Sequence, residues 1–197
     1  VAHKKSGTPF LRQAAKAETV TKIAPGDPPV QKCINMGGAL EAPNEGDWGY
    51  RIRREDFRRL KREGFDSVRI PIKWSERTQT RDPYTIDENL FRRIDNVVRY
   101  ALDADLKVII NVHHYDEINE DAEGELPRLY AIWDQIIAHY NGFPEGLIFE
   151  FLNEPHTQMT PKRVDDMNRT LLAKVRAVSA DRWVILGGGQ WGTLDGL

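Results

Sequence analysis

The 197-residue sequence predicts an α/β fold of the (β/α)8-barrel type, truncated after its fifth strand. Short apolar segments alternate with longer segments whose apolar residues recur at helical spacing. The five strand-like segments start at residues 33, 65, 106, 147 and 183, so successive starts are separated by 32, 41, 41 and 36 residues. Repeated strand–helix units of this size are typical of parallel strands joined by crossover helices. An open doubly wound sheet has the same rhythm and is the competing architecture.

Each element has its own local signals. We expect strands over residues 33–37, 65–71, 106–112, 147–152 and 183–187. We expect helices over residues 53–63, 87–104 and 126–140, and a further helix that starts at Pro161 with Thr160 as its N-cap. The helix over 87–104 is amphipathic, and its apolar face comprises Leu90, Ile94, Val97, Ala101 and Leu102. We expect residues 1–29 to form an N-terminal lead-in and residues 30–197 to form the barrel portion.

Composition excludes several classes of partner. The formal net charge of −2 creates no field that would favour nucleic acid or an anionic membrane. No apolar run approaches the roughly 20 residues that span a bilayer, and residues 1–20 lack the apolar stretch of a signal peptide. The single cysteine, Cys33, excludes an intramolecular disulfide and a Cys-rich zinc site, and we expect it to be buried in the first strand.

Polar and aromatic residues follow the strands at their carboxyl ends, where parallel barrels carry their chemistry. These residues are Asn35 and Glu41 after the first strand, Arg69 in the second, His113, His114 and Tyr115 after the third, Asn153 and Glu154 after the fourth, and Trp191 after the fifth. Strand formation by itself requires only apolar residues and turns at these positions. Their joint placement therefore predicts a functional site.

Glu154 is the most informative of these residues, because a carboxyl group at a strand end can donate a proton to a glycosidic oxygen. Asn153 can bind a neighbouring sugar hydroxyl, and Arg69 can keep a second carboxylate ionised. Each residue also has an ordinary explanation: a solvated glutamate, surface histidines, a buried ion pair for Arg69, or packing for Trp74 and Trp191. A nucleotide-binding domain is a minor alternative, because the first loop lacks the Gly-x-Gly-x-x-Gly pattern.

These residues lie in five segments that closely resemble glycoside hydrolase family 5, the cellulase and mannanase group. The segments are residues 35–49, 68–74, 111–115, 149–155 and 188–191. The resemblance implies that Glu154 is the general acid/base and that Asn153 binds the substrate 2-hydroxyl. It makes Arg69, His113 and His114 supporting residues of the site, and it makes Asn35, Glu41, Tyr115 and Trp191 substrate-binding residues. It also implies a retaining hydrolysis of β-1,4-linked glucans or mannans outside the cell, with no metal and no cofactor.

The chain departs from the family pattern in two ways. Gly38 stands where the family commonly has asparagine, which removes a side-chain amide from the first loop. Strands six to eight, which include the strand that supplies the nucleophilic glutamate, are not in this sequence. Glu150 is a poor substitute, because it precedes Glu154 by four residues on the same strand and is expected to point into the lower barrel.

Two expectations and one alternative function follow from the missing strands. The chain alone hydrolyses little or nothing. A C-terminal barrel fragment or self-association covers the open sheet. The alternative function is a non-catalytic carbohydrate-binding or barrel-assembly fragment.

Overall fold

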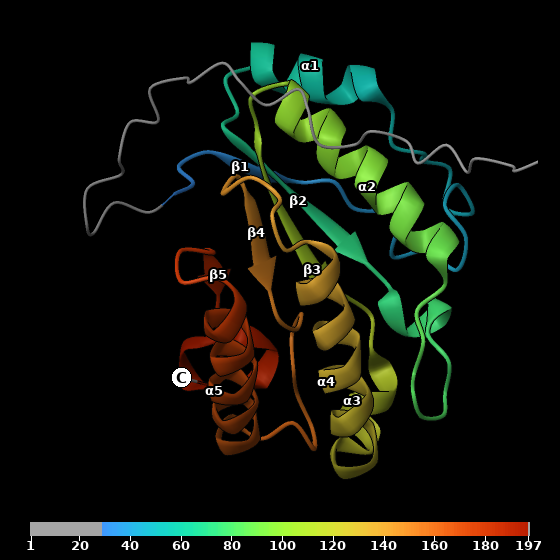
Figure 1. Ribbon diagram of the computed structural model, residues 1–197, viewed down its shortest axis with the longest axis vertical. Helices are drawn as coiled ribbons and strands as arrows, with labels where there is room; N and C mark the ends of the chain where they lie inside the picture. The colour runs from blue at the N-terminus through green and yellow to red at the C-terminus, as the bar shows by residue number, and fades with distance from the viewer. Residues whose placement is uncertain (1–28, 197) are drawn as a thin grey trace, which may run out of the picture.

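The computed structural model describes residues 29–196, which form a five-stranded sheet and its connecting helices (Figure 1). The strands are β1 (Cys33–Asn35), β2 (Ser67–Ile72), β3 (Lys107–Val112), β4 (Leu147–Glu150) and β5 (Val184–Ile185). All neighbours pair in parallel, and the order β1-β2-β3-β4-β5 follows the sequence. A doubly wound sheet reverses its strand order at a switch point, and no reversal occurs among these strands. The predicted parallel α/β fold is therefore confirmed, and its strand order is that of a (β/α)8 barrel.

Within residues 29–196, five α-helices lie between successive strands, one short 3-10 helix follows β2 and two more follow β5. The α-helices are α1 (Arg54–Arg62), α2 (Glu88–Asp103), α3 (Asp116–Glu120), α4 (Ala122–His139) and α5 (Pro161–Val178). The 3-10 helices are η1 (Trp74–Arg77), η2 (Gln190–Gly192) and η3 (Leu194–Gly196). The predicted start of α5 is confirmed, because the Thr160 hydroxyl accepts a hydrogen bond from the amide of Arg163.

Two helical features were not predicted. Helix α3 is too short for its apolar periodicity to be recognised in the sequence. Helix α4 starts four residues before the predicted residue 126, because the Asp121 side chain caps it by accepting a hydrogen bond from the amide of Gly124 at 3.0 Å. Pro127 lies inside this helix rather than at its first turn. The capping aspartate, not the proline, therefore determines where α4 begins.

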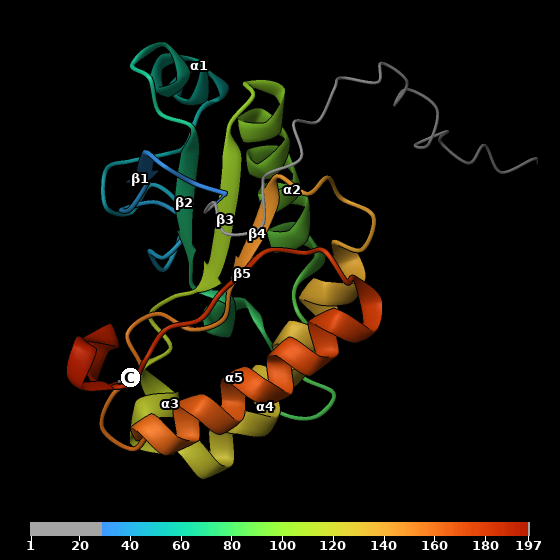
Figure 2. The same cartoon turned by 90° about the vertical axis from the view of Figure 1, so that its left-hand side faces the viewer.

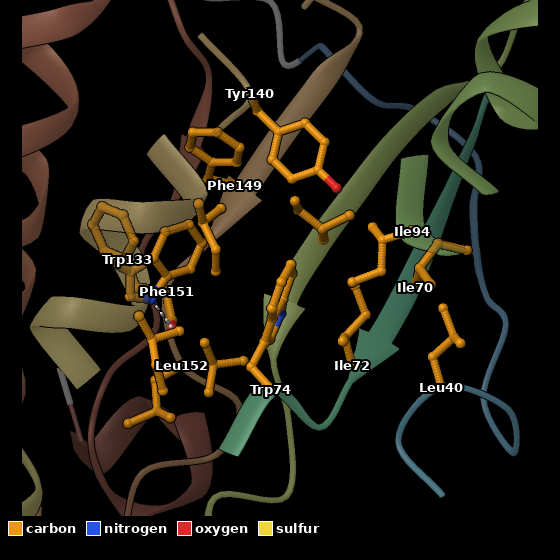
Figure 3. Packing of buried hydrophobic residues seen from close by; sticks show 14 of the residues in the cluster. Leu40, Ile70, Ile72, Trp74, Ile94, Trp133, Tyr140, Phe149, Phe151 and Leu152 are labelled. Carbon is orange, nitrogen blue, oxygen red and sulfur yellow. Dashed lines mark hydrogen bonds between the residues drawn. The ribbon is translucent and has the colours of Figure 1, made fainter. Parts of the chain in front are cut away.

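The two faces of the sheet differ in chemistry. Val68, Ile70 and Ile72 of β2 are fully buried in a core that also contains side chains of the helices. Figure 3 shows part of this core, in which the Trp133 indole nitrogen donates to the carbonyl of Phe151 at 2.9 Å. Because side chains alternate along a strand, the intervening residues face the opposite side. That inner face carries the polar residues of the candidate site.

At one edge of the sheet, the prediction that Cys33 is buried is wrong. Cys33 is exposed rather than buried, because β1 has a sheet neighbour only on its β2 side within residues 29–196. At the other edge β5 is only two residues long, and Trp183 and Leu186 beside it are exposed. The predicted lead-in, residues 1–29, lies outside the described residues except for Pro29. No helix within residues 29–196 is long and apolar enough to cross a membrane.

Candidate active site

The carboxyl ends of the strands meet at one end of the sheet. Figure 2 shows the loops after β2, β3 and β4 at this end, together with α3 and the C-terminal 3-10 helices. The parallel register pairs Asn35 with Arg69, and Asn111 with Glu150. Residues from four successive units are therefore brought to one place, as the strand-end argument predicted.

Arg69 is the centre of the polar network on the inner face. Its Nε and Nη2 atoms donate to the two carboxylate oxygens of Glu150 at 2.6 and 2.5 Å. Its Nη2 also donates to Asn153 Oδ1 at 2.8 Å, and its Nη1 donates to Asn35 Oδ1 at 2.8 Å. Burial acts to lower the pKa of Arg69, but the hydrogen bonds and charge of Glu150 outweigh it, so the pKa is raised. Arg69 is a permanent cation that orients three side chains.

Asn111 belongs to the same network, although sequence reasoning did not single it out. Its side chain is fully buried, and its Nδ2 lies 3.2 Å from Glu150 Oε1 and 3.3 Å from His113 Nδ1. The indole nitrogen of Trp74 donates to the Asn111 backbone carbonyl at 3.0 Å. The available signal was a polar residue on an otherwise apolar strand, on the inner face with Glu150.

The two histidines follow β3 and pack edge to face, with ring centroids 4.6 Å apart. His114 is exposed and has a left-handed backbone, with φ of 49°, and its ring also meets the edge of Trp48. Burial, and then the neighbouring His114 and Arg69, lower the pKa of His113 to about 3. His113 is therefore a neutral imidazole at physiological pH.

Glu154 lies at the carboxyl end of β4 with its side chain exposed to solvent. Its backbone is left-handed, with φ of 45°, a conformation that costs a non-glycine residue about 1–2 kcal/mol. The preceding residue, Asn153, is anchored to β3 by a 2.9 Å hydrogen bond from its amide to the carbonyl of Val112. Among the described residues, no side chain forms a hydrogen bond with the Glu154 carboxylate. Strain of this kind is concentrated at functional sites.

Two of the predicted substrate-binding residues, Tyr115 and Glu41, are buried. Tyr115 is only 2% exposed, and its hydroxyl donates to Glu125, so it is turned into the protein. Glu41 is buried, and its carboxylate accepts hydrogen bonds from the amides of Gly38 and Ala39. It stabilises the first loop, in which Gly38 has a φ of 82° that favours glycine.

A further predicted substrate-binding residue, Trp191, is 58% exposed and stacks on His156 with ring centroids 4.7 Å apart. It remains accessible, unlike Tyr115 and Glu41. Within residues 29–196, no three histidine, cysteine or acidic side chains are grouped so that they could hold a metal ion.

Comparison with known proteins agrees with the family resemblance. The profile of the cellulase family, glycosyl hydrolase family 5, matches residues 31–196. Endoglucanase H of Acetivibrio thermocellus is 39% identical over 163 residues, which are 83% of this chain and 18% of that protein. Endoglucanase A of Ruminococcus albus is 31% identical over 75% of this chain and 46% of its own length.

Solved structures give the same result. The crystal structure of Thermotoga maritima Cel5A in complex with mannotriose superposes with a TM-score of 0.83 and 42% identity, over 85% of this chain and 55% of that chain. Another Cel5A structure, in complex with cellobiose, has a TM-score of 0.80. The chain therefore has the strands and helices of about half of such a barrel. With a family profile matched over most of its length, this chain belongs to glycosyl hydrolase family 5, the cellulase family.

Proposed function

We propose that this chain forms the acid/base half of a retaining endo-glycoside hydrolase that acts on β-1,4-linked polysaccharide, either a glucan such as cellulose or a mannan. The observation that carries the proposal is the exposed Glu154 carboxyl group, held on a left-handed backbone beside the Arg69 network. The endoglucanase names of its relatives and the mannotriose and cellobiose complexes of Cel5A support this substrate class.

In the proposed reaction Glu154 protonates the departing glycosidic oxygen and later removes a proton from the attacking water. Asn153 binds the sugar beside it. Because Asn153 Oδ1 accepts from Arg69 Nη2 at 2.8 Å, its amide is oriented and its two N–H groups are the donors left for the 2-hydroxyl. Arg69 acts through Asn153 and Glu150 as a positioning residue.

The nucleophile is proposed to come from outside these four strand–helix units and strand β5. A retaining enzyme needs a second carboxyl group about 5–5.5 Å from the first. Both oxygens of Glu150 already accept hydrogen bonds from Arg69, and one also accepts from Asn111, so Glu150 is engaged in the network. On this proposal the 197-residue chain alone hydrolyses little or nothing.

We also propose that the open edges at β1 and β5 are covered in the active species, by a complementary half-barrel or by a second copy of the chain. Exposed Trp183 and Leu186 beside β5 support this, because uncovered apolar edges favour association. Light scattering tests it: a monodisperse monomer at dilute and concentrated loading would contradict self-association. The site of action is proposed to be extracellular, since an insoluble polysaccharide does not cross a membrane.

A second candidate function is carbohydrate binding without catalysis. Trp48 is 55% exposed and Trp191 is 58% exposed, and aromatic faces of this kind stack on sugar rings. Calorimetry with cellotetraose measures binding separately from hydrolysis. Binding without turnover, even in the presence of a complementary half-barrel, favours this second function.

The decisive experiment combines the chain with the part of Thermotoga maritima Cel5A that the superposition leaves uncovered. Hydrolysis of soluble β-glucan is expected from the mixture and not from either part alone. Glu154→Gln should reduce that activity by about 100-fold or more, the usual range for loss of a general acid/base. Glu117→Gln, an exposed glutamate on α3, is the matched control and should have no effect. Full activity of the Glu154→Gln mixture would contradict the proposal.

A further inference from the structure

In the side-chain amide of Asn111, the nitrogen has hydrogen-bond partners among the described residues and the oxygen has none. Its Nδ2 lies within hydrogen-bond distance of both Glu150 Oε1 and His113 Nδ1, at 3.2 and 3.3 Å. Its Oδ1 is buried and has no hydrogen-bond partner among the described residues. A buried oxygen without a partner is unfavourable, so the contacts of Nδ2 must determine the orientation of this amide.

The neighbours allow only one orientation. Glu150 is paired with Arg69 through two hydrogen bonds, and an ionised carboxylate only accepts hydrogen bonds. Turning the amide over would place Asn111 Oδ1 against Glu150 Oε1, so that two acceptors would face each other. Nδ2 therefore faces Glu150, and the same nitrogen faces His113.

An amide nitrogen only donates, so the His113 atom that it meets must accept. In a neutral imidazole one ring nitrogen carries the proton and the other is the acceptor, and the partner of one determines the state of the other. We infer that Asn111 is a positioning residue that holds neutral His113 in the tautomer with its proton on Nε2, which makes His113 a fixed hydrogen-bond donor at the candidate site.

The groups around the ring favour the same state. Burial is the largest cause of the lowered pKa of His113, and the charges of His114 and Arg69 add to it, so that the pKa is about 3. The imidazole ring of His113 is therefore neutral at pH values well above 3. Nε2 has no hydrogen-bond partner among residues 29–196, so its N–H group is available to an oxygen acceptor such as a sugar hydroxyl or a carboxylate. That use rests on the proposed function, whereas the tautomer does not.

Nitrogen NMR of the histidine-labelled 197-residue chain tests the inference without any substrate. We expect His113, assigned with a His113→Gln variant, to have an unprotonated Nδ1 and a protonated Nε2. Asn111→Asp replaces the donor with a carboxylate, so Nδ1 should become protonated. Asn168→Asp is the matched control, because Asn168 is also buried with an unpartnered Oδ1 but lies on α5 and donates to Gly187. It should leave His113 unchanged.

Two results would overturn the inference: a proton on Nδ1 of His113 in the wild-type chain, or an unprotonated Nδ1 in folded Asn111→Asp. If Asn111→Asp does not fold, the His113 resonances of Asn111→Leu are compared with those of the wild type. Removing the Asn111 amide donor should shift the Nδ1 resonance of His113, and an unshifted resonance contradicts the inference. Loss of hydrolysis in Glu154 experiments leaves all these readouts unaffected, so the two proposals fail independently.

Discussion

Arg69 on β2 and Glu150 on β4 are joined by two parallel hydrogen bonds that reach across the intervening strand β3. Their side chains are only 22% and 12% exposed. The pair links three strands and orients Asn153, the residue next to Glu154. A charge pair at this depth is costly to break, because the remaining partner keeps its desolvation penalty.

Glu150→Gln is therefore expected to lower the free energy of unfolding by about 3 kcal/mol, since it leaves the Arg69 cation without a counter-charge. Urea denaturation measures this change. Asp103→Asn provides the control: Asp103 pairs with Arg54 at 2.6 Å, but both side chains are about half exposed, so less than about 1 kcal/mol is expected. Equal effects of the two variants would contradict the role assigned to the inner pair.

Stability should fall on acidification partly through His113. Its pKa is lowered to about 3 in the folded chain, whereas an unfolded histidine titrates near 6.5. Between these values the unfolded state binds more protons, so this contribution is complete above about pH 6.5 and is lost as the pH falls toward 3. Through His113, the free energy of unfolding changes by at most about 1.4 kcal/mol per pH unit.

The test compares denaturation of the wild type and His113→Gln from about pH 7 to about pH 4. Carboxylates titrate in both proteins, so the difference between the two curves isolates His113. The wild type should lose more stability than the variant over this range. Parallel curves would show that folding does not perturb the imidazole.

The backbone of Glu154 predicts a conflict between stability and function. Its φ of 45° strains any residue with a β-carbon, and glycine relieves that strain. Glu154→Gly should raise the free energy of unfolding by up to about 1 kcal/mol, after the entropy cost of glycine, although it removes the proposed acid. Glu154→Gln keeps the strain and should leave stability unchanged. A destabilised glycine variant would mean that the exposed carboxylate makes stabilising contacts.

Arg128 of α4 anchors the segment after β2. It is 4% exposed, and it donates to the backbone carbonyls of Ser75, Thr78 and Gln79 at 2.7, 2.8 and 3.1 Å. Arg128→Met leaves these oxygens without that donor, so a loss of about 2–4 kcal/mol is expected. Hydrogen exchange should also speed up locally in η1.

The control for Arg128 is Arg169→Met on α5, where an exposed arginine pairs with Asp165 one turn away. This surface pair should contribute less than about 1 kcal/mol. A similar small loss for Arg128→Met would mean that water replaces its three hydrogen bonds.

The order and type of most elements could be predicted from the sequence, because the signals are local. Apolar periodicity and the Thr160–Pro161 start of α5 each act within a few residues, and each agrees with the structure. The same reasoning missed α3, and it placed the start of α4 too late because the Asp121 cap was not recognised.

The sequence by itself determined that parallel strands bring polar residues such as Arg69, His113 and Glu154 to one end of the sheet, because strand direction and side-chain alternation are encoded locally. Only the tertiary structure decided which of them interact. Arg69 pairs with Glu150, 81 residues away, through the register across β3, and that register also includes Asn111. Long-range packing likewise buries Tyr115 and leaves Cys33 exposed, since burial depends on neighbours that are distant in the chain.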